Sequence, residues 1–481
     1  MRTLDRFRWV YCQLDTLYRC LPQRIRQVLN DLPIGLDATY ERTLQRISRE
    51  EKQHAHRLFQ CLVAAVRPLQ LDELAEIFAV DFDPNSEPKL VEGWLPEDPE
   101  EAVLSACSTL IKIVGDENSK IVQFSHFSVK EFLTSDRFQA SELGKPLPLH
   151  IPLDAAHAVL TRACLTVLLQ LDETLDQQRL EMLPLAPYAA KHWVEHAKVE
   201  NVASQSKVPM ERLFNPKKPH LVAWTRIYNI DKGNEPSTHD QDLDDDNGER
   251  PSPARATSLY YAALCGFAGV AEYLITVHAE DVNVKCGHHG TPLHAASYTG
   301  HLDAARLLVD RHADVKMTNI HKRTALCSAY DGGHLDVMQM LLERGADVNE
   351  RYSYSARLLH TAAHHGQAEV VRLLLRNHAD VDARDSVNQT PLHEASTNGH
   401  VEVIEHLLDH GADVNAETTS QSTPLHRASE GGHLEAVRTL LTRGADVRMR
   451  NRKNRSAFEV ATLREHSAVA ELLAEHGAER V

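Results

Sequence analysis

The chain has 481 residues, which at about 150 residues per domain predicts two to four folded units. Hydrophobic residues make up 42% of the chain and charged residues 25%, which excludes wholesale disorder, a collagen-like fibre and a membrane-spanning bundle. Lys and Arg total 52 against 68 Asp and Glu, and the resulting net charge of -16 disfavours nucleic acid as a partner.

Cysteine usage and hydropathy indicate a reducing compartment. The eight cysteines form no Cys-x-x-Cys pair and lack the dense spacing of a disulfide or zinc framework, so we expect reduced thiols, many of them in cores. They are Cys12, Cys20, Cys61, Cys107, Cys164, Cys265, Cys286 and Cys327. The amino terminus carries charges, and no run of about 18 uncharged apolar residues occurs. These features predict a soluble cytoplasmic protein, with the nucleus as the alternative location.

The first 50 residues are predicted to form a helical tail. Apolar residues recur at helical spacing in residues 7–17 (FRWVYCQLDTL) and 36–47 (LDATYERTLQRI), and Asp37 is placed to cap the second helix.

Residues 51–140 show the pattern of a winged-helix domain. Helices are predicted over 57–69 (RLFQCLVAAVRPL), 70–80 (QLDELAEIFAV) and 100–113 (EEAVLSACSTLIKI). A strand, a polar turn and a second strand follow within 113–127 (IVGDENSKIVQFSHF). In a DNA-binding winged helix the third helix would read the bases, but this one offers one lysine and no arginine. We therefore prefer a protein-contact role.

The next part of the chain is predicted to be a helical region over 141–225, clearest in 155–171 (AAHAVLTRACLTVLLQL) and 188–197 (YAAKHWVEHA). An acidic flexible linker over 226–256 follows. Its residues 231–250 hold eight acidic side chains against two basic ones and almost nothing apolar, the composition of a disordered segment. An acidic recognition tail is the alternative.

Several motifs before residue 200 resemble the region after the nucleotide-binding module in fungal NACHT-type receptors, signal-transducing ATPases or GTPases similar in layout to animal NOD-like receptors. The motifs are FRWVYCQLDTLYRCLP, LDATYERTL, RPLQLDELAE, FSHFSVKEFLTS and YAAKHWVEHA. In those receptors a histidine in an F-x-H-x-S-x-x-E-F context contacts the bound diphosphate. The resemblance implies that role for His126, flanked by Phe124, Ser128, Glu131 and Phe132. In the alternative, His126 only caps the next helix while Phe124, Phe127 and Phe132 fill the core.

A phosphate cradle is missing from this sequence. The motif G-x-x-x-x-G-K-[ST] does not occur, and Gly144-Lys145 is followed by Pro146. We therefore expect the chain to be the carboxy-terminal portion of such a receptor without its nucleotide-binding module, either as a truncated gene model or as a stand-alone remnant.

A 33-residue repeat dominates the second half. Tetrads begin at Thr291 (TPLH), Thr324 (TALC), Arg357 (RLLH), Thr390 (TPLH), Thr423 (TPLH) and Ser456 (SAFE), and a further copy begins at Thr257 (TSLY), 34 residues before Thr291. Alanine, glycine and leucine recur in three further columns. Thr before Pro suits a helix start, alanine permits close helix contact, glycine ends the short helix, and leucine pairs bury the longer one. Seven copies would share one continuous core.

The motif TPLH-x-A, followed by GH and by LL-x-x-G-A-D-V-N, resembles the ankyrin repeat over residues 257–481. The first copy (TSLY) and the last, with Glu465 in the glycine column, depart from the pattern and are expected to cap the array. The fold class is therefore mainly α, an ankyrin solenoid preceded by a winged-helix and helical region.

The histidines of the repeats are interpreted as structural. His294, His360, His393 and His426 share the fourth place of the tetrad, where an imidazole can bond to turn backbone. His360 and His364 have the i, i+4 spacing of a metal site, but no H-E-x-x-H or Cys/His ligand set accompanies them, so no metal site is expected.

The resemblance implies that partner contacts concentrate on the hairpin tips and before the helix-ending glycines, along the concave face. Carried onto this sequence, the contact residues are His288, Tyr298, Ile320, His321, Arg323, Asp331, Tyr354, His364, His365, Val387, Gln389, Asn398, Glu430 and Arg452. Such aromatic, histidine and arginine side chains suit a protein or peptide partner, although each could be plain solvated surface. The tip glycine common in the family is replaced by His289, Lys322, Ser355, Asn388, Gln421 and Asn454.

Three functional hypotheses follow. The first is a non-enzymatic recognition or adaptor protein that binds a protein or peptide through its ankyrin array, without catalytic residues, cofactor, metal or membrane. The second is a nucleotide-dependent signalling NTPase whose catalytic module is missing from this chain or supplied in trans. The third is a passive scaffold. The sequence indicates neither the partner nor the trigger, output or oligomeric state.

Overall fold

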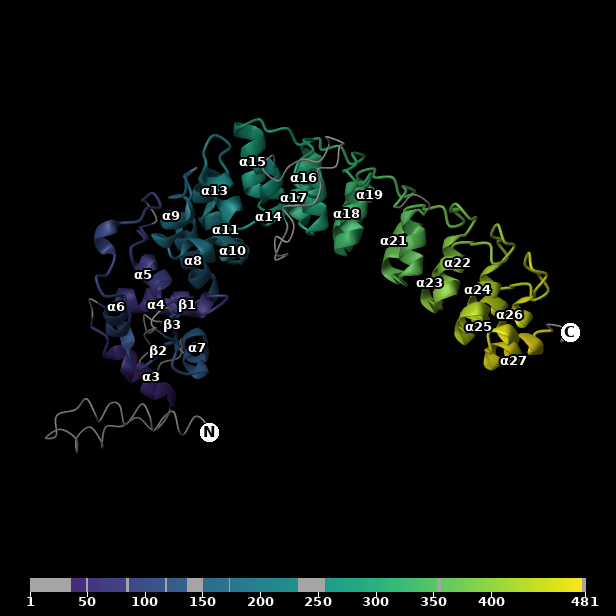
Figure 1. The fold of residues 1–481 in the computed structure, drawn as a ribbon, viewed down its shortest axis with the longest axis horizontal. Helices are drawn as coiled ribbons and strands as arrows, with labels where there is room; N and C mark the ends of the chain where they lie inside the picture. Colours follow the sequence, from purple (N-terminus) through teal and green to yellow (C-terminus); the bar gives the residue numbers. More distant parts are fainter. Residues whose placement is uncertain are drawn as a thin grey trace, which may run out of the picture. The chain divides into compact units, whose positions relative to one another are not determined.

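The computed structural model describes residues 36–48, 51–83, 86–116, 119–135, 150–172, 174–231, 256–352 and 356–477. The described residues divide into two compact units, one of residues up to 231 together with Gly269–Glu280, the other of 256–268 and 281 onward. Figure 1 shows the elements of each. The helix predicted over 7–17 and most of the acidic linker lie outside the described residues. Among these residues no helix has the length and apolar character needed to cross a bilayer.

The first unit begins with a winged-helix arrangement, as the sequence predicts. Its elements are α3 (Leu36–Gln45), α4 (Lys52–Ala64), β1 (Leu69–Gln70), α5 (Leu71–Phe78), η2 (Glu92–Trp94), α6 (Pro99–Cys107), β2 (Ile111–Val114), β3 (Ile121–Phe124) and α7 (Phe127–Thr134). The strands form an antiparallel sheet in the order β1-β3-β2, with Ile111 opposite Phe124 and Val114 opposite Ile121.

Three details of that prediction were wrong. The first helix spans Lys52–Ala64 instead of 57–69, and Leu69 belongs to strand β1. The third helix ends at Cys107, and Ile111, Lys112 and Ile113 belong to strand β2. The β-branched side chains there suit a pleated, half-buried strand better than a helix. The sheet also has a third short strand, β1, where two strands are expected. Since Lys112 lies in the strand, the described α6 sequence PEEAVLSAC carries no basic residue at all.

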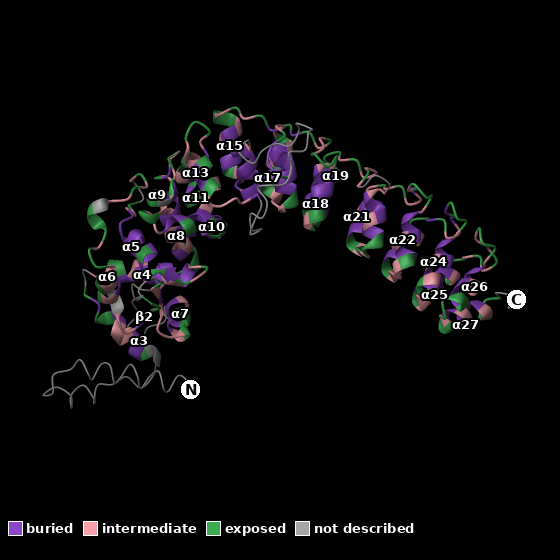
Figure 2. Cartoon of the chain, in the orientation of Figure 1, coloured by how far each residue is buried: buried purple, intermediate pink, exposed green. Residues whose placement is uncertain are grey.

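The rest of the first unit is helical. It comprises α8 (Leu153–Leu168), α9 (Gln177–Glu181), α10 (Ala186–Ala197), α11 (Val202–Gln205), α12 (Lys207–Leu213), α13 (His220–Ile227) and α15 (Ala268–Val277). Helix α8 packs against α4 and α10, and Figure 2 shows the buried residues concentrated along these helices. Trp193 and Trp224 are fully buried with ring centres 5.3 Å apart, and the Trp224 indole donates a hydrogen bond to the Ala190 carbonyl at 2.8 Å.

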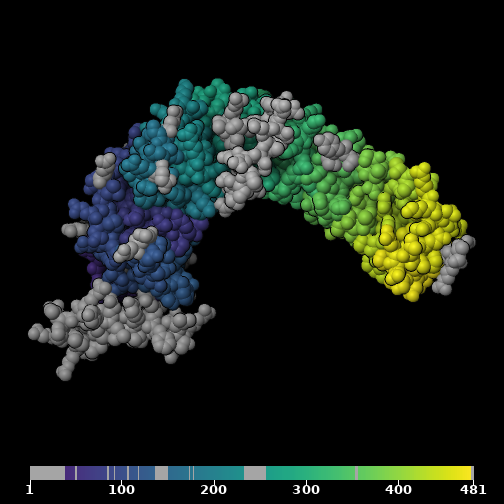
Figure 3. Space-filling model, in the orientation of Figure 1, coloured from purple at the N-terminus to yellow at the C-terminus, as the bar shows by residue number. Residues whose placement is uncertain are grey.

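The second unit is a row of helices that carries the predicted repeats (Figure 1), and Figure 3 shows the same repeats in space-filling form. It contains α14 (Ser258–Cys265), α16 (Pro292–Tyr298), α17 (Leu302–Asp310), α18 (Ala325–Gly332), α19 (Leu335–Glu343), α20 (Leu358–His364), α21 (Ala368–Arg376), α22 (Pro391–Asn398), α23 (Val401–Asp409), α24 (Pro424–Gly431), α25 (Leu434–Thr442), α26 (Ala457–Leu463) and α27 (Ser467–Glu475). The inner helices α14, α16, α18, α20, α22, α24 and α26 begin at the tetrads. Every alanine of the predicted column, from Ala262 to Ala461, has zero exposure because successive inner helices meet there.

Buried histidines join neighbouring repeats. In His294 the Nδ1 atom lies 2.7 Å from the Thr291 hydroxyl and the Nε2 atom lies 3.0 Å from the Arg323 carbonyl in the next hairpin. His393 and His426 repeat this arrangement, with Nε2 3.0 Å from the Ser422 carbonyl and 3.1 Å from the Arg455 carbonyl. An imidazole with its proton on Nε2 can donate to the carbonyl and accept at Nδ1, so both ring nitrogens are hydrogen-bonded. The structural interpretation of the tetrad histidines is therefore confirmed.

Besides the first and last repeats, two internal repeats depart from this arrangement. Cys327 replaces the histidine in α18, and there the carboxylate of Glu350 accepts hydrogen bonds from the Thr324 hydroxyl at 2.6 Å and from the Cys327 thiol at 3.1 Å. Arg357 replaces the threonine before α20. The Nε2 atom of His360 still lies 3.1 Å from the Gln389 carbonyl, but its Nδ1 atom is buried without a partner.

We expect Arg357→Thr to stabilise the repeat array by about 1 kcal/mol, because the new hydroxyl would cap α20 and bond to His360 Nδ1. Arg357 already has the extended backbone of a cap, with φ -83° and ψ 164°, and its ion pair with Asp380 is long at 4.0 Å. Native-state hydrogen exchange of the α20 amides in the full chain would measure the gain. Arg357→Ala is the control, since it removes the same side chain without adding a hydroxyl and should give no gain.

Candidate partner-binding site

The predicted contact residues depend on the geometry of the hairpin tips. Lys322, Asn388, Gln421 and Asn454 stand where a tip glycine is common, and all four adopt left-handed backbone, with φ between 55° and 58°. Adjacent tips are also connected: the Thr419 amide donates to the Val387 carbonyl at 3.0 Å, and the Arg452 amide donates to the Ser420 carbonyl at 2.9 Å. These four tips therefore keep the glycine-type turn without glycine, and the last three of them are joined by backbone hydrogen bonds.

At the hairpin before α16, two histidines gather around an exposed tyrosine. The His289 ring stacks on Tyr298 with centres 4.3 Å apart, and His288 meets His289 edge-on at 5.2 Å. Tyr298 is 42% exposed. The predicted contact residues His288 and Tyr298 are thus brought together, with His289 between them.

A second group, here called the Arg323 cluster, joins the repeats of α18 and α20. The Arg323 guanidinium pairs with Asp331 at 2.7 Å and lies 4.4 Å from the centre of the Tyr352 ring. The Tyr352 hydroxyl donates to the other Asp331 oxygen at 2.5 Å, so one carboxylate holds both side chains.

The Arg323 cluster continues through Tyr330 to His365. The Tyr330 ring lies edge-on to Tyr352 at 5.3 Å, and its hydroxyl lies 3.2 Å from His365 Nδ1. Burial raises the pKa of Tyr330 to about 12, so the neutral phenol can donate this hydrogen bond. The predicted contact residues Arg323, Asp331 and His365 are therefore brought together, and the two tyrosines were missed.

A third group, here called the Glu394 network, runs from α20 to α26. The carboxylate of Glu394 lies 2.9 Å from His364 Nδ1 and accepts from the Gln389 amide at 3.0 Å, and Arg427 donates to Gln389 Oε1 at 3.1 Å. Arg427 and Arg464 both pair with Glu430.

Four of the predicted contact residues belong to this network, because the Asn398 amide also reaches His364 Nδ1 at 3.2 Å. They are His364, Gln389, Asn398 and Glu430. Glu394 and Arg427 were missed, although they occupy one column 33 residues apart, directly after the tetrad histidine. Their polar character on a short, otherwise buried helix is the signal that could have found them.

The remaining predicted contact residues lie singly. Ile320 and Val387 are 47% and 45% exposed at their tips, and His321 and Arg452 are exposed as well. Tyr354 lies outside the described residues. Exposed aliphatic side chains at two tips add apolar contact area to a surface that is otherwise aromatic and charged.

His126 caps helix α7 in the first unit. Its Nδ1 atom accepts from the Ser128 amide at 3.3 Å and lies 2.6 Å from the Ser128 hydroxyl, which in turn lies 2.9 Å from the Tyr40 hydroxyl. Phe132 is buried against Tyr40, but Phe127 is 60% exposed, so its expected place in the core was wrong. The Phe127 ring instead lies tilted against the His126 ring, with the ring centres 4.3 Å apart. A nucleotide-sensing role for His126 stays a prediction.

Comparison with known protein families agrees with this architecture. Residues 259–352 and 354–418 match a model described as ankyrin repeats (3 copies), and residues 407–461 match one described as ankyrin repeats (many copies). Residues 40–143 match the winged helix domain of GPI inositol-deacylase. The chain thus contains ankyrin repeats, and its first unit contains a winged-helix domain of this type, which is found in NACHT-like proteins.

Two fungal proteins are similar in sequence. Azaphilone pigments biosynthesis cluster protein L of Monascus ruber is 33% identical over 305 residues, 60% of this chain and 61% of that protein. Vegetative incompatibility protein HET-E-1 of Podospora anserina is 29% identical over 130 residues, 26% of this chain and 9% of that protein. The chain therefore spans about three fifths of the first relative and less than a tenth of the second.

Similar solved structures are ankyrin-repeat domains. The human ASB11 domain is 29% identical, with a TM-score of 0.41 over 47% of this chain and 100% of that domain. The domain of Bcl-3, a member of the IkappaB protein family, is 31% identical, with a TM-score of 0.43 over 46% of this chain and 99% of that domain.

Proposed function

We propose that this protein is a non-enzymatic recognition protein that binds a protein or peptide partner along the hairpin tips and inner helices of its repeats, the predicted concave face. Ankyrin repeats support a protein-interaction role in general. In this chain the inner helices α16 to α26 carry partly exposed aromatic, arginine and carboxylate side chains at their ends, where a packed core does not need them.

The Arg323 cluster is the observation that carries the proposal. Arg and Tyr are the residue types enriched among interface hot spots. Asp331 fixes both Arg323 and Tyr352, so these side chains lose less conformational entropy when a partner binds. A partly exposed ion pair such as Arg323–Asp331 contributes under about 1 kcal/mol to stability. Stabilisation of the fold alone therefore gives little reason for this arrangement of side chains.

The proposal predicts that Arg323→Ala and Tyr352→Ala each weaken partner binding by at least tenfold, the loss of roughly 1.4 kcal/mol or more. The full chain would serve as bait in a cell extract, and partner affinity would then be measured with the purified pair. Arg344→Ala is the matched control, because Arg344 makes a similar ion pair, with Asp310 at 2.5 Å, but follows outer helix α19. Equal retention of partner by all three variants, or no partner common to replicate captures, would contradict the proposal.

We further propose that the first unit passes partner binding on to an effector, in the manner of the sensor half of a NOD-like receptor. The matches to a winged-helix domain found in NACHT-like proteins and to part of HET-E-1 support this extension. The same proposal includes the domain boundaries predicted from the sequence, which are 1–50, 51–140, 141–225, 226–256 and 257–481. In a passive scaffold, by contrast, hydrogen exchange in the winged helix would not change when the repeats are occupied.

A nucleotide-dependent NTPase supplied in trans is the second candidate. The observation in its favour is that His126 stands in the F-x-H-x-S-x-x-E-F context and is only partly buried. That candidate requires a NACHT-type partner whose nucleotide affinity changes when this chain is added, and His126→Ala should abolish the change.

A further inference from the structure

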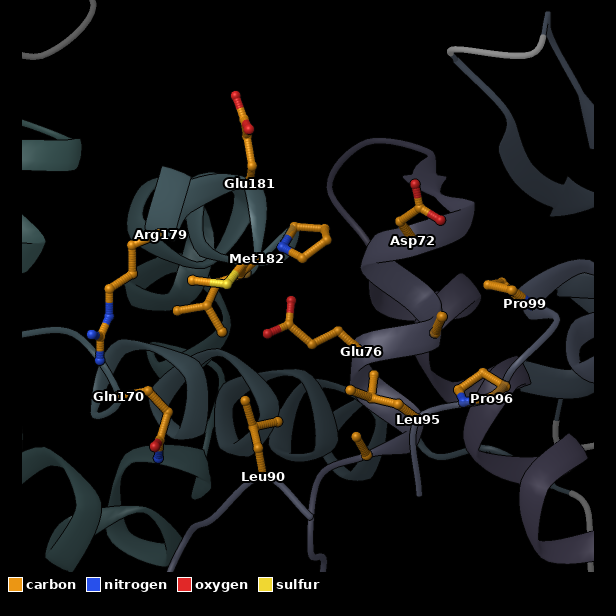
Figure 4. A pocket seen from close by; sticks show the side chains of 14 residues that line it. Asp72, Glu76, Leu90, Leu95, Pro96, Pro99, Gln170, Arg179, Glu181 and Met182 are labelled. Atoms are coloured by element: carbon orange, nitrogen blue, oxygen red, sulfur yellow. The ribbon is translucent and has the colours of Figure 1, made fainter. Parts of the chain in front are cut away.

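A pocket in the first unit contains a buried carboxyl group that no described side chain or backbone group fully satisfies. The pocket has a volume of about 690 Å³ and lies between α5, the segment from Leu90 to Pro99, and the segment from Arg179 to Pro184. Figure 4 shows the Glu76 side chain directed into its middle, with Met182 and Arg179 on one side and Leu95 and Pro96 on the other. This volume falls within the range of small-molecule sites.

Glu76 is only 4% exposed, yet one of its oxygens has nothing to bond to. Its Oε2 atom accepts from the Leu185 amide at 2.7 Å, whereas Oε1 is buried without a partner. A buried oxygen without a hydrogen-bond partner destabilises the folded state, and more so if it is charged. The cost would be recovered if a ligand in the pocket supplied a hydrogen-bond donor.

The charged groups around Glu76 favour a cationic donor. Asp72, Glu76 and Glu181 line the pocket with Arg179, and Arg179 is already paired with Asp172 at 3.2 Å. Glu73, the preceding carboxylate on α5, also repels a negative charge on Glu76, but it is held by Arg67 through two hydrogen bonds. The pocket therefore has an excess of negative charge, which attracts cations and repels anions.

The walls of the pocket favour an apolar ligand body. Leu90, Leu95, Met182 and three prolines line it, and Met182 and Leu95 are 67% and 50% exposed. Large exposed apolar side chains around a single buried polar group form the usual pattern of a small-molecule site, in which apolar contacts supply affinity and the polar group fixes orientation.

We propose that this pocket binds a small organic amine, whose ammonium group pairs with the Glu76 carboxylate while its apolar body lies against Leu90, Leu95 and Met182. The proposal concerns the first unit alone and does not depend on partner binding by the repeats. Burial raises the pKa of Glu76 to about 7, so binding of an ammonium ion should strengthen as the pH rises from 6 to 8 and the carboxyl group ionises.

The test uses 4-phenylbutylamine, shorter and longer arylalkyl amines, and 4-phenylbutanol as the neutral analogue. Their binding to the full chain would be measured by titration calorimetry and saturation-transfer NMR at pH 6 and pH 8. We expect an amine of the series to bind at least tenfold more tightly than the alcohol at pH 8, with a smaller difference at pH 6. Failure of the whole amine series to bind, or equal binding of amine and alcohol, would overturn the proposal.

The Glu76→Gln variant distinguishes amine binding at Glu76 from nonspecific attraction of amines to the negatively charged protein. Glutamine can keep the bond to the Leu185 amide and removes a buried charge, so this variant should fold with unchanged or higher thermal stability. We expect it to lose the preference for amine and the pH dependence. Glu195→Gln, at an exposed position outside the pocket, should keep both. If Glu76→Gln bound the amines as tightly as the unmodified chain, Glu76 would not be the recognition group.

A last comparison tests the source of the ammonium group. If N-acetyl-lysine methylamide bound tenfold more tightly than every amine of the series, the ligand would be a lysine side chain of a protein partner, and the small-molecule assignment would be overturned. Weaker binding of the lysine derivative supports the assignment.

Discussion

Gly399→Ala should destabilise the repeat array by about 3 kcal/mol. Two independent effects combine at this position. Gly399 ends α22 with φ 72°, and the left-handed conformation costs about 1–2 kcal/mol for a residue with a Cβ atom. In addition, a Cβ atom there would lie 2.5 Å from the ring of His433 in the following repeat, and overpacking of this kind costs about 1–3 kcal/mol. The His433 ring cannot move freely, because its Nε2 atom bonds to the Thr397 carbonyl at 3.0 Å.

Gly333→Ala is the matched control. Gly333 stands in the same column with φ 77°, but the following repeat has Gln367 in place of the histidine, and a Cβ atom would meet nothing within 4 Å. Only the backbone cost of about 1–2 kcal/mol applies there. Native-state hydrogen exchange around α22 and around α18 in the full chain would measure both variants. Equal losses would show that the contact between Gly399 and His433 carries no energetic weight.

The glycine column illustrates what could be predicted from the sequence. The 33-residue period indicates which positions share an environment, so the helix starts, the zero-exposure alanines and the left-handed glycines all follow from the repeat pattern. The second reason for glycine, the close contact with the following repeat, does not follow from that pattern. The contact that excludes a Cβ atom comes from a histidine of the next repeat. In the last described helix pair Glu465 occupies the glycine column with φ 63°, and no described repeat follows it to supply such a histidine.

The candidate site was predictable to a similar extent. The positions at the tips and helix ends follow from the repeat, but which of them meet depends on side chains outside the pattern. Tyr352 lies in a hairpin whose sequence departs from the consensus, and Glu350 takes over a hydrogen-bonding role only because Cys327 has replaced histidine. Glu76 occurs within an ordinary amphipathic helix, where no sequence pattern distinguishes a buried carboxylate from a solvated one.

Lowering the pH from 7.5 to 5.5 should destabilise the repeats by roughly 2–3 kcal/mol through His294 and His393. Burial lowers the pKa of each to about 4, from an ordinary value near 6.5. Between these values the unfolded chain binds a proton that the folded chain does not, so the stability is complete above pH 6.5 and is lost as the pH falls toward 4. Burial also lowers the pKa of His360 and His426, which acts in the same direction. Burial of Glu350 and Asp382 raises the pKa of these carboxyl groups and opposes the effect in part.

The double variant His294→Gln and His393→Gln isolates the two imidazoles. It should be less stable than the unmodified chain at pH 7.5, because the bonds to the Arg323 and Ser422 carbonyls are weakened, but its stability should change much less between pH 7.5 and 5.5. Native-state hydrogen exchange of α16 and α22 amides, corrected for the intrinsic pH dependence of exchange, gives both quantities. His321→Gln is the control, since that ring is exposed at a hairpin tip and should leave the pH profile as it is. A profile as steep in the double variant as in the unmodified chain would mean that the tetrad histidines do not set the acid sensitivity of the array.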